Sequence, residues 1–258
     1  MPAAAEAPSG EEPGTEGGPL FFVADLECPR LEPADAHHLT RVLRIRSGDG
    51  LIVSDGQGAW RLCRLAGNPS HPTPEPVGPI SRVPRSLPVL TVAFALVKGQ
   101  RPELVVQKLT ELGVDTIVPF VADRSVVRWD ADRAATNARR LQRVSHEASM
   151  QSRRCWLPEI TAVQTFASAS SLAGAARADR GGAPLSIATP TVLIGPEGGW
   201  SDAERAADLA VIGLGVHVLR AETAAIAAGV ALAGLRAGLW VPPNRPQRAG
   251  SVISDYGS

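Results

Sequence analysis

The sequence predicts an α/β protein with a mostly parallel sheet, preceded by a small all-β domain. Three observations support this fold class. In the second half of the chain, continuous apolar segments alternate with segments of helical periodicity, as in βαβ units. In the first third, short apolar segments are separated by glycine-containing turns, as in small β-barrels. Between the two parts, seven prolines lie within residues 69–88 and mark a candidate linker, although the strand-like residues 80–83 could belong to the barrel.

Size and composition exclude several classes of protein. The chain has 258 residues and 27.0 kDa, with 44% hydrophobic and 20% charged residues, which excludes wholesale disorder. No apolar run approaches the ~18 residues that a membrane helix needs, and the first residues lack the basic and apolar regions of a secretory signal. Cys28, Cys63 and Cys155 are far apart and include no CxxC pair, which disfavours a disulfide framework and a zinc ribbon. We therefore expect a protein of the reducing cytoplasm with no membrane partner.

The formal net charge of zero conceals a segregation of charge along the chain. Residues 1–36 hold eight acidic residues and one basic residue, whereas residues 37–154 hold eighteen basic and ten acidic residues. A basic middle region favours a polyanionic partner, most simply nucleic acid. Most of the basic residues are arginines, which suit bidentate contacts with phosphate. A GC-rich genome would produce the same arginine bias, but it would not produce the segregation.

The N-terminal elements are short. Residues 1–18 are acidic and rich in proline and glycine, and they are predicted to be a disordered tail. The apolar residues 20–23 suit a strand, and the apolar spacing in 37–45 predicts a helix. Residues 51–56 and 59–65 form a predicted hairpin around a glycine-rich turn. Short strands with tight turns together predict a small β-barrel.

After the proline-rich segment, strands and helices alternate. Residues 89–97 form a continuous apolar strand, a helix begins at Pro102 and ends at Gly113, and residues 116–121 form the next strand. This strand, helix, strand succession implies a parallel sheet. Further along, we predict helices at 132–151 and 163–176, after the capping box Ser201–Glu204, and at 222–238, strands at 191–194 and 216–219, and a loop at 177–190.

Two segments at predicted strand ends are candidates for a ligand site. Gly195–Gly199 contains three glycines, which let backbone N–H groups approach a ligand closely. It matches neither GxGxxG nor a P-loop, and a purely structural turn would have the same composition. Leu214–Ala224 ends the next predicted strand and enters an alanine-rich helix. Both segments lie at the edge where open α/β sheets bind ligands. Within the second segment, Arg220 and Glu222 are either functional groups or a loop ion pair.

Four stretches together carry a resemblance to a known family. They are His38–Arg44 with Gly48-Asp49, the stretch from Lys98-Gly99 through Gln107–Val114 to Arg124-Ser125, Ile194–Gly199, and Leu219–Ala224. In this order and spacing, the chain resembles the RsmE family of bacterial 16S rRNA (uracil-N3) methyltransferases, which belongs to the SPOUT superfamily. The resemblance implies methylation of N3 of one uridine of 16S rRNA (position 1498 in the conventional rRNA numbering), with S-adenosylmethionine (SAM) as cofactor.

The resemblance also implies domains and partners. A PUA-like RNA-binding domain would span residues 19–84, a SPOUT domain with a trefoil knot residues 88–241, and a C-terminal tail residues 242–258. Such enzymes are homodimers that act on the small ribosomal subunit without a metal. SAM would bind in the knot, mostly through backbone groups. The implied cofactor-binding residues are Leu193, Ile194, Gly195, Glu197, Gly198, Gly199, Leu214, Leu219, Thr223 and Ala224.

The implied reaction requires that uracil N3 lose its proton before or during attack on the methyl group. By the resemblance, Arg220 would stabilise the uracil anion, and Glu222 would orient Arg220 or accept the proton. Glu197 could instead stabilise its loop. The implied RNA-binding residues are His38, Arg41, Arg44, Arg46, Lys98, Arg124 and Arg154, with Arg61 as a further backbone contact. For each arginine, a solvated surface charge is the alternative interpretation.

Two positions depart from the family pattern. Met150 stands where the family often has Glu, which excludes a general base at that position, and His217 stands where the family often has Arg. Two other functions stay open at this point. A non-catalytic RNA-binding factor of ribosome assembly would not bind the cofactor. A SPOUT methyltransferase acting on another RNA would label a different nucleoside.

Overall fold

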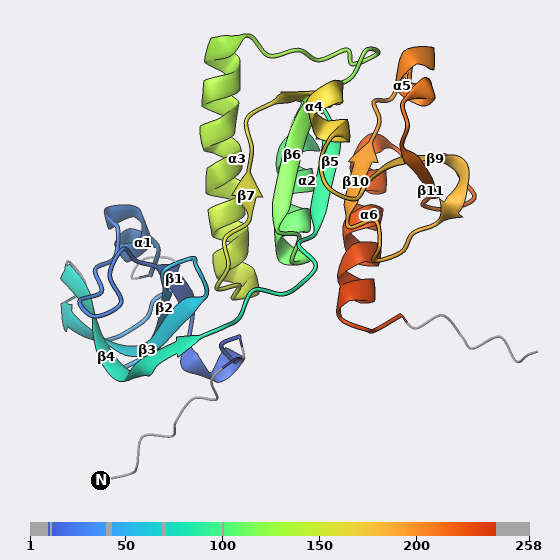
Figure 1. Ribbon diagram of the computed structural model, residues 1–258. Coiled ribbons are helices and arrows are strands. Elements are labelled where there is room, and N and C mark those ends of the chain that lie inside the picture. Colours follow the sequence, from blue (N-terminus) through green and yellow to red (C-terminus); the bar gives the residue numbers. More distant parts are fainter. Residues whose placement is uncertain (1–9, 11, 40–42, 69–70, 100, 241–258) are drawn as a thin grey trace, which may run out of the picture.

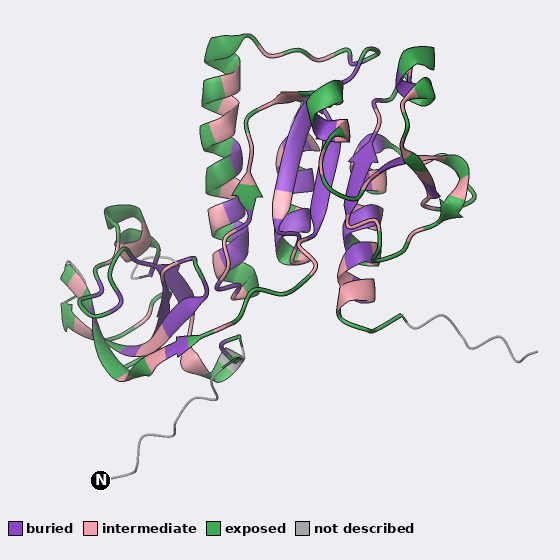
Figure 2. Cartoon of the chain, in the orientation of Figure 1, coloured by how far each residue is buried: buried purple, intermediate pink, exposed green. Residues whose placement is uncertain are grey.

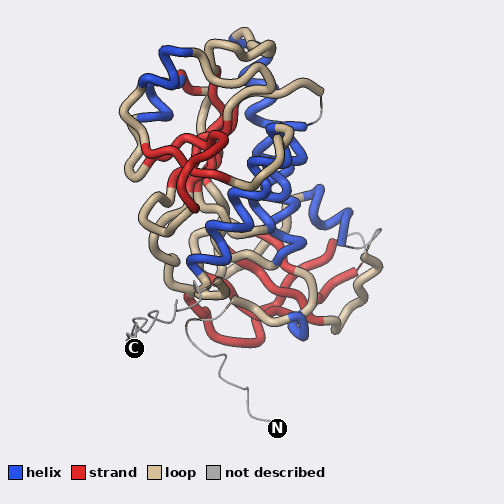
Figure 3. Tube along the Cα trace, turned by 90° about the vertical axis from the view of Figure 1, so that its right-hand side faces the viewer, coloured by secondary structure: helices blue, strands red, loops and turns tan. Residues whose placement is uncertain are grey.

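The computed structural model describes residues 10, 12–39, 43–68, 71–99 and 101–240, and it contains two sheets (Figure 1). A four-stranded sheet lies in the N-terminal part and a seven-stranded sheet in the C-terminal part. In the side view of Figure 3, the strands form two separate groups. The predicted α/β fold class with a preceding β region is therefore confirmed, whereas the trefoil knot stays a prediction.

The N-terminal sheet has the order β1-β2-β3-β4. Its strands are β1 (Leu20–Phe22), β2 (Gly50–Ser54), β3 (Ala59–Asn68) and β4 (His71–Arg82). β1 is parallel to β2, and the other neighbours are antiparallel, so the predicted hairpin is β2 with β3. Side chains alternate along each strand. As a result Phe21 and Leu51 pack in one apolar cluster, and Leu20 and Ile52 in a second cluster.

Much of the predicted linker is strand β4, which pairs with β3. Pro72, Pro74 and Pro76 occupy alternate positions of β4. Proline has no N–H to donate, but alternate residues of an edge strand direct their N–H groups away from the neighbouring strand. Because β4 lies at the edge of its sheet, this spacing leaves the pairing with β3 intact. The composition of a linker is therefore compatible with a strand at this position.

A helix begins earlier in the chain than the helix predicted at 37–45, and residues 40–42 of the predicted range lie outside the described residues. α1 spans Pro33–His37, and Arg44 has a φ of +55°, outside the helical region. Leu39 is fully buried in the N-terminal core, and Ile45 packs against the same cluster. The apolar spacing of this segment therefore includes two residues that pack in the N-terminal core.

Part of the predicted disordered tail is packed against the protein. Thr15–Gly17 forms a short 3₁₀ helix. The Arg153 guanidinium donates hydrogen bonds to the carbonyl oxygens of Gly14 and Gly18, at 3.0 and 2.5 Å. Glu12 accepts the backbone N–H of Cys155 at 3.0 Å. Ordered structure therefore begins before residue 19.

The C-terminal sheet is parallel throughout, with the order β11-β9-β10-β5-β6-β7, and β8 also pairs with β6. Its strands are β5 (Thr91–Ala95), β6 (Thr116–Val121), β7 (Glu159–Ile160), β8 (Gln164–Thr165), β9 (Ala175–Pro184), β10 (Thr191–Ile194) and β11 (Ala210–Gly213). β5, β6 and β10 are continuous apolar segments because both faces of a parallel sheet are covered. The succession of β5, a helix and β6 predicted from the sequence is confirmed.

Helices cover the two faces of this sheet unequally (Figure 2). One face packs against α2 (Arg101–Glu111), α3 (Ala131–Ser152) and α6 (Ala221–Arg236), and the other packs against α4 (Phe166–Ser170) and Trp200. Strand β5 shows the alternation: Val92 and Phe94 face the larger cluster, whereas Ala93 and Ala95 face the smaller one.

Helices α2 and α6 lie side by side and run in the same direction. Arg101 at the start of α2 contacts Glu222 at the start of α6, and Arg236 at the end of α6 contacts Gly113 just after α2. Gly229 permits the close approach, because a Cβ there would lie 2.6 Å from the Leu109 side chain.

Three predictions in the last third of the chain are wrong. The predicted helix at 163–176 is reduced to α4, and most of β9 lies in the predicted loop at 177–190. The strand predicted at 216–219 is a loop, because β11 already ends at Gly213. Val216 and Val218 alternate as in a strand, yet they are 86% and 76% exposed.

The residues after α3 fix the N-terminal sheet to the rest of the protein. The Leu157 N–H donates to the Gly56 carbonyl at 2.9 Å, and the Gly58 N–H donates to the Cys155 carbonyl at 3.1 Å. The Trp156 indole N–H donates to the Val83 carbonyl at 2.9 Å. The two parts are thus joined by hydrogen bonds as well as by the chain.

Candidate functional site

The carboxyl ends of β5, β6 and β10 lie at one edge of the parallel sheet, where ligands of α/β proteins bind. The segments that follow these strands, 96–99, 122–125 and 195–200, meet at this edge. Arg124 Nη1 lies 3.5 Å from the Gly198 carbonyl oxygen. A Cβ on Gly198 would lie 3.2 Å from the Arg124 carbonyl oxygen, so a larger residue there would require the Arg124 segment to move by a few tenths of an ångström.

Trp200 anchors the loop formed by residues 195–200. Its indole is buried, stacks on Phe120 with the ring centroids 6.2 Å apart, and donates its N–H to the Ala178 carbonyl at 2.9 Å. A Cβ on Gly195 would lie 2.8 Å from the Trp200 ring, and Gly199 has a φ of +70°. Two of the glycines are therefore explained by packing and turn geometry, and the loop is preformed.

The capping box predicted at Ser201–Glu204 is confirmed and begins helix α5 (Asp202–Ala206). Ser201 Oγ accepts the Glu204 N–H at 3.2 Å, and Glu204 Oε2 accepts the Ser201 N–H at 2.8 Å. The other carboxylate oxygen of the buried Glu204 accepts the Asp123 N–H at 2.9 Å. Glu204 therefore also ties the segment that carries Arg124 to loop 195–200.

Loop 214–220 has few such restraints. Between Gly215 and Leu219, no backbone group hydrogen-bonds to another residue that the structure describes. Gly215 has a φ of +154° and open space where a Cβ would lie. Because polar backbone groups need partners, water or a ligand must supply them here. The loop thus offers both donors and acceptors to a bound molecule.

Three charged side chains from distant parts of the chain meet beside these two loops, and we call them the edge cluster: Arg101, Glu197 and Glu222. Arg101 Nη1 donates to Glu197 Oε1, and Arg101 Nε lies 3.6 Å from Glu222 Oε1. The second oxygen of Glu222, Oε2, is buried and has no hydrogen-bond partner among the described residues. One carboxylate oxygen at the start of α6 therefore has no described partner.

Arg220 does not form the ion pair with Glu222 that was one of its two interpretations in the sequence. It is exposed at the N-cap of α6 and forms no ion pair with any residue that the structure describes. Arg101, rather than Arg220, is the cation at Glu222. Arg101 was missed in the sequence, although its position just after a strand of a parallel sheet places it at the ligand-binding edge by the same rule that selected loop 195–200.

The implied cofactor residues fall into two groups: those with buried or packed side chains and those that are accessible at the site. The side chains of Leu193 and Ile194 are buried in opposite faces of the sheet, so only their backbone groups are available. Leu214 and Ala224 pack against the larger cluster. The remaining residues lie on the two loops or at the start of α6, exposed or half-buried: Gly195, Glu197, Gly198, Gly199, Leu219 and Thr223.

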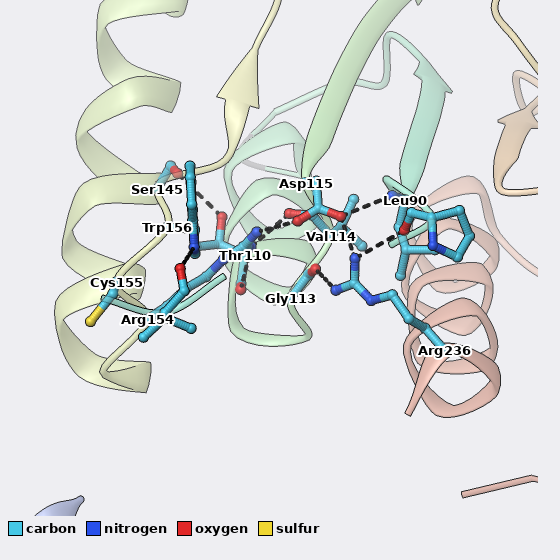
Figure 4. Close-up of polar contacts among 12 residues, drawn as sticks. Leu90, Thr110, Gly113, Val114, Asp115, Ser145, Arg154, Cys155, Trp156 and Arg236 are labelled. Atoms are coloured by element: carbon cyan, nitrogen blue, oxygen red, sulfur yellow. Dashed lines mark hydrogen bonds and ion pairs between the residues drawn. The ribbon is translucent and has the colours of Figure 1, made fainter. Parts of the chain in front are cut away.

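Arg154 lies in a buried network instead of on an RNA-facing surface (Figure 4). Only 8% of its surface is exposed, and it donates to the carbonyls of Thr110 and Val114 and to Asp115, the last at 3.0 Å. Asp115 also accepts from Arg236 and from the Leu90 N–H. Burial lowers the pKa of Arg154 to about 10, so it stays charged at neutral pH. The expected RNA contact is not supported here.

We call Asp115, Arg154 and Arg236 the buried cluster. Arg236 adds two backbone contacts, to the Gly113 carbonyl at 2.7 Å and to the Pro88 carbonyl at 3.3 Å. Both Asp115 oxygens have partners, so the carboxylate is fully used inside the protein.

Five of the other implied RNA-binding residues are exposed. His38, Arg44 and Arg46 lie on the N-terminal part, and Lys98 and Arg124 lie at the sheet edge; Arg41 is outside the described residues. Arg61 is bonded to Glu27 at 2.9 Å and to the Gly78 carbonyl at 2.6 Å, so it supports its own sheet.

The two departures from the family pattern have different surroundings. Met150 packs against both apolar clusters of the N-terminal sheet, so the apolar side chain contributes to the contact between the two parts. His217 is exposed in loop 214–220, and nothing in the structure explains the substitution.

The described residues contain neither a metal-binding group nor a membrane-spanning helix. No group of three His, Cys, Asp or Glu side chains within them could hold a metal ion. None of the helices in the described ranges is long and apolar enough to cross a membrane.

Comparison with known proteins gives consistent results. Residues 85–233 match the RNA methyltransferase domain family, and residues 31–71 match the RNA methyltransferase PUA domain family. The ribosomal RNA small subunit methyltransferase E of Synechocystis sp. is 33% identical over 218 residues, which cover 75% of this chain and 69% of the relative.

Solved structures resemble the fold over most of its length. A probable rRNA methyltransferase from Porphyromonas gingivalis has a TM-score of 0.73 and 27% identity, over 86% of this chain and 100% of that one. A ribosomal RNA small subunit methyltransferase E from Neisseria gonorrhoeae, solved with bound S-adenosyl methionine, has a TM-score of 0.70 and 26% identity, over 84% of this chain and 97% of that one.

Proposed function

The chain belongs to the ribosomal RNA small subunit methyltransferase E family, and from this premise we propose that it transfers a methyl group from SAM to N3 of one uridine of 16S rRNA. The substrate is the small ribosomal subunit in the cytoplasm. The RNA-binding contribution of the N-terminal domain is supported by its match to the PUA domain family of RNA methyltransferases.

The observation that carries this proposal is that two loops lie beside Arg220 and Glu222. Loop 195–200 is preformed, and loop 214–220 has backbone groups without described hydrogen-bond partners. SAM combines an adenosine, which has both donors and acceptors, with a cationic sulfonium and an amino acid group. The free backbone groups of 215–219 suit the adenosine, and the exposed carboxylate of Glu197 suits the cationic part. The residues at this edge therefore fit SAM.

Arg220 and Glu222 divide the chemistry of the uracil between them. When bound, SAM supplies an electrophilic methyl group on sulfur. Arg220, exposed and free of a described carboxylate partner, donates to a uracil carbonyl oxygen and stabilises the anion that forms on loss of the N3 proton. The N-terminus of α6 adds a positive partial charge at the same place. Glu222 accepts the proton at its unpartnered oxygen.

Exposed basic residues position the RNA. His38, Arg44 and Arg46 contact the backbone from the N-terminal domain, and Lys98 and Arg124 hold the RNA next to the target base. Because the target nucleotide belongs to a folded RNA, it is flipped out of its stack to reach the site. RNA affinity is expected to fall steeply with salt concentration.

The proposal includes a homodimer. Leu87, Val230, Leu239 and Trp240 are exposed apolar residues that line a groove of about 620 Å³ at the end of α6. Apolar patches of this kind are typical of interfaces. Light scattering during size-exclusion chromatography tests the dimer, and a monomer at micromolar concentration would contradict it.

The decisive experiment is methyl transfer from labelled SAM to small ribosomal subunits that lack the modification, followed by mass spectrometry of the nucleosides. We expect 3-methyluridine from the decoding region. Label in another nucleoside would assign the protein to a different RNA site. SAM binding without transfer would point to a different RNA substrate, and no binding would favour a non-catalytic RNA-binding protein.

A further inference from the structure

We propose that Arg101 is a positioning residue of this site. Arg101 fixes the Glu222 carboxylate and holds loop 195–200 against the start of α6. The inference rests on the proposed function, because it gives Arg101 a role through the proton acceptor of that reaction. Arg101 is not placed in contact with the uracil or with SAM.

The topology brings the three partners of the edge cluster together. Arg101 is the first residue of α2, shortly after β5. β5 pairs in parallel with β10, so the start of α2 and loop 195–200 lie at the same edge. α6 runs parallel to α2, and its first turn, with Glu222, therefore lies beside Arg101. One guanidinium thus joins three segments that are far apart in the sequence.

Burial and charge explain why a cation is needed here. The Glu222 side chain is only 13% exposed, whereas those of Arg101 and Glu197 are 35% and 51% exposed. A carboxylate shielded from water is costly unless a cation or hydrogen bonds compensate it. Among the described residues, Arg101 is the cation that contacts Glu222, and it leaves Oε2 free. The contact therefore orients the carboxylate without consuming its capacity to accept a proton.

The geometry also explains why arginine stands at this position. Nη1 contacts Glu197 while Nε contacts Glu222, so two nitrogens of one planar group reach two carboxylates. Lysine offers a single nitrogen, which could neutralise the carboxylate charge but could not hold Glu197 and Glu222 at fixed positions at the same time. The Lys108–Glu111 pair on the same helix, at 2.8 Å and three residues apart, is a local ion pair with no link to either loop.

The test compares Arg101→Ala and Arg101→Lys with Lys108→Ala as the matched control on α2. For Arg101→Ala we expect single-turnover methyl transfer at saturating SAM to fall about 100-fold, since misplaced reacting groups have effects of that size. The dissociation constant of SAM should rise less than about tenfold. Arg101→Lys should recover part of the rate, and Lys108→Ala should keep both values.

A double variant tells positioning from general structural damage. If Arg101 acts through Glu222, Arg101→Ala should lower the rate of Glu222→Gln little further, whereas independent effects would multiply. In the protein without SAM, amide hydrogen exchange in residues 221–224 should be faster in Arg101→Ala than in the control.

Two results would overturn the inference: a rate for Arg101→Ala equal to that of Lys108→Ala, or losses that multiply with those of Glu222→Gln. Failure of the wild-type protein to bind SAM or methylate the subunit would overturn the proposed function instead. In that case the hydrogen-exchange comparison, made without SAM, still decides whether Arg101 fixes the start of α6.

Discussion

Helices α2 and α6 carry a cluster of arginine and carboxylate groups at each end, and the two clusters are built in opposite ways. The edge cluster, at the start of both helices, has one arginine and two carboxylates, is partly exposed and leaves Glu222 Oε2 without a described partner. The buried cluster, at the end of both helices, has one carboxylate and two arginines and uses both Asp115 oxygens. A saturated network fixes a structure, whereas an unsaturated one can still bind and react.

Removal of the carboxylate from the buried cluster should have the largest effect on stability. Asp115→Asn leaves Arg154 and Arg236 as buried cations without a carboxylate, which typically costs about 3–5 kcal/mol. Urea unfolding of the two proteins measures this loss. The control is Glu111→Gln, which breaks the exposed pair with Lys108 and should cost less than about 1 kcal/mol. A loss of similar size in both variants would show that burial does not raise the cost of removing the carboxylate from an ion pair.

At the other end of the helices, Arg220→Ala should affect the reaction and spare the fold. Loss of a group that stabilises developing negative charge lowers rates by about 10²–10³-fold, while removal of an exposed side chain changes the free energy of unfolding by less than about 0.5 kcal/mol. Single-turnover transfer and SAM titration measure the two parts. Arg180→Ala, another exposed arginine, serves as control. Wild-type turnover in Arg220→Ala would remove Arg220 from the mechanism.

Gly195→Ala tests whether loop 195–200 is held by packing. The added Cβ would lie 2.8 Å from the buried Trp200 ring, and overpacking of this kind costs about 1–3 kcal/mol. We expect a lower thermal midpoint together with weaker SAM binding. Gly14→Ala, where a Cβ meets nothing within 4 Å, should leave both unchanged. An unchanged thermal midpoint for Gly195→Ala would mean that loop 195–200 shifts to accommodate the added methyl group at little cost.

The smallest expected effect concerns Asp35, outside both clusters. Burial raises the pKa of Asp35, and His146 and His38 oppose that shift. An acid with a raised pKa in the folded state favours folding most when it is protonated, and this contribution is lost as pH rises through that pKa. Asp35→Asn should therefore be slightly more stable at pH 7, by less than about 0.5 kcal/mol, and lose that advantage near pH 4. Unfolding curves at the two pH values measure the difference, and a variant less stable at pH 7 would contradict the sign.

Local sequence patterns predicted individual helices and strands, but they did not predict which side chains tertiary packing buries. The capping box at Ser201 and the strand 116–121 follow from the residues themselves. Arg124 and Arg154 are the same residue type, but only tertiary packing makes the first exposed and the second buried. Val216 and Val218 show the same limit, since alternating valines indicate a strand whether or not a neighbouring strand is present. The position of Arg101 after a strand indicates the sheet edge, but its two carboxylate partners are distant in sequence and are brought to it only by the fold.

The prolines of β4 have a consequence for the protein in a crowded solution. An exposed sheet edge can recruit a strand from another chain and so begin aggregation. Pro72, Pro74 and Pro76 lack the N–H groups that such a strand would need along that edge. The same residues that resemble a linker in the sequence therefore act as a barrier to intermolecular β-pairing.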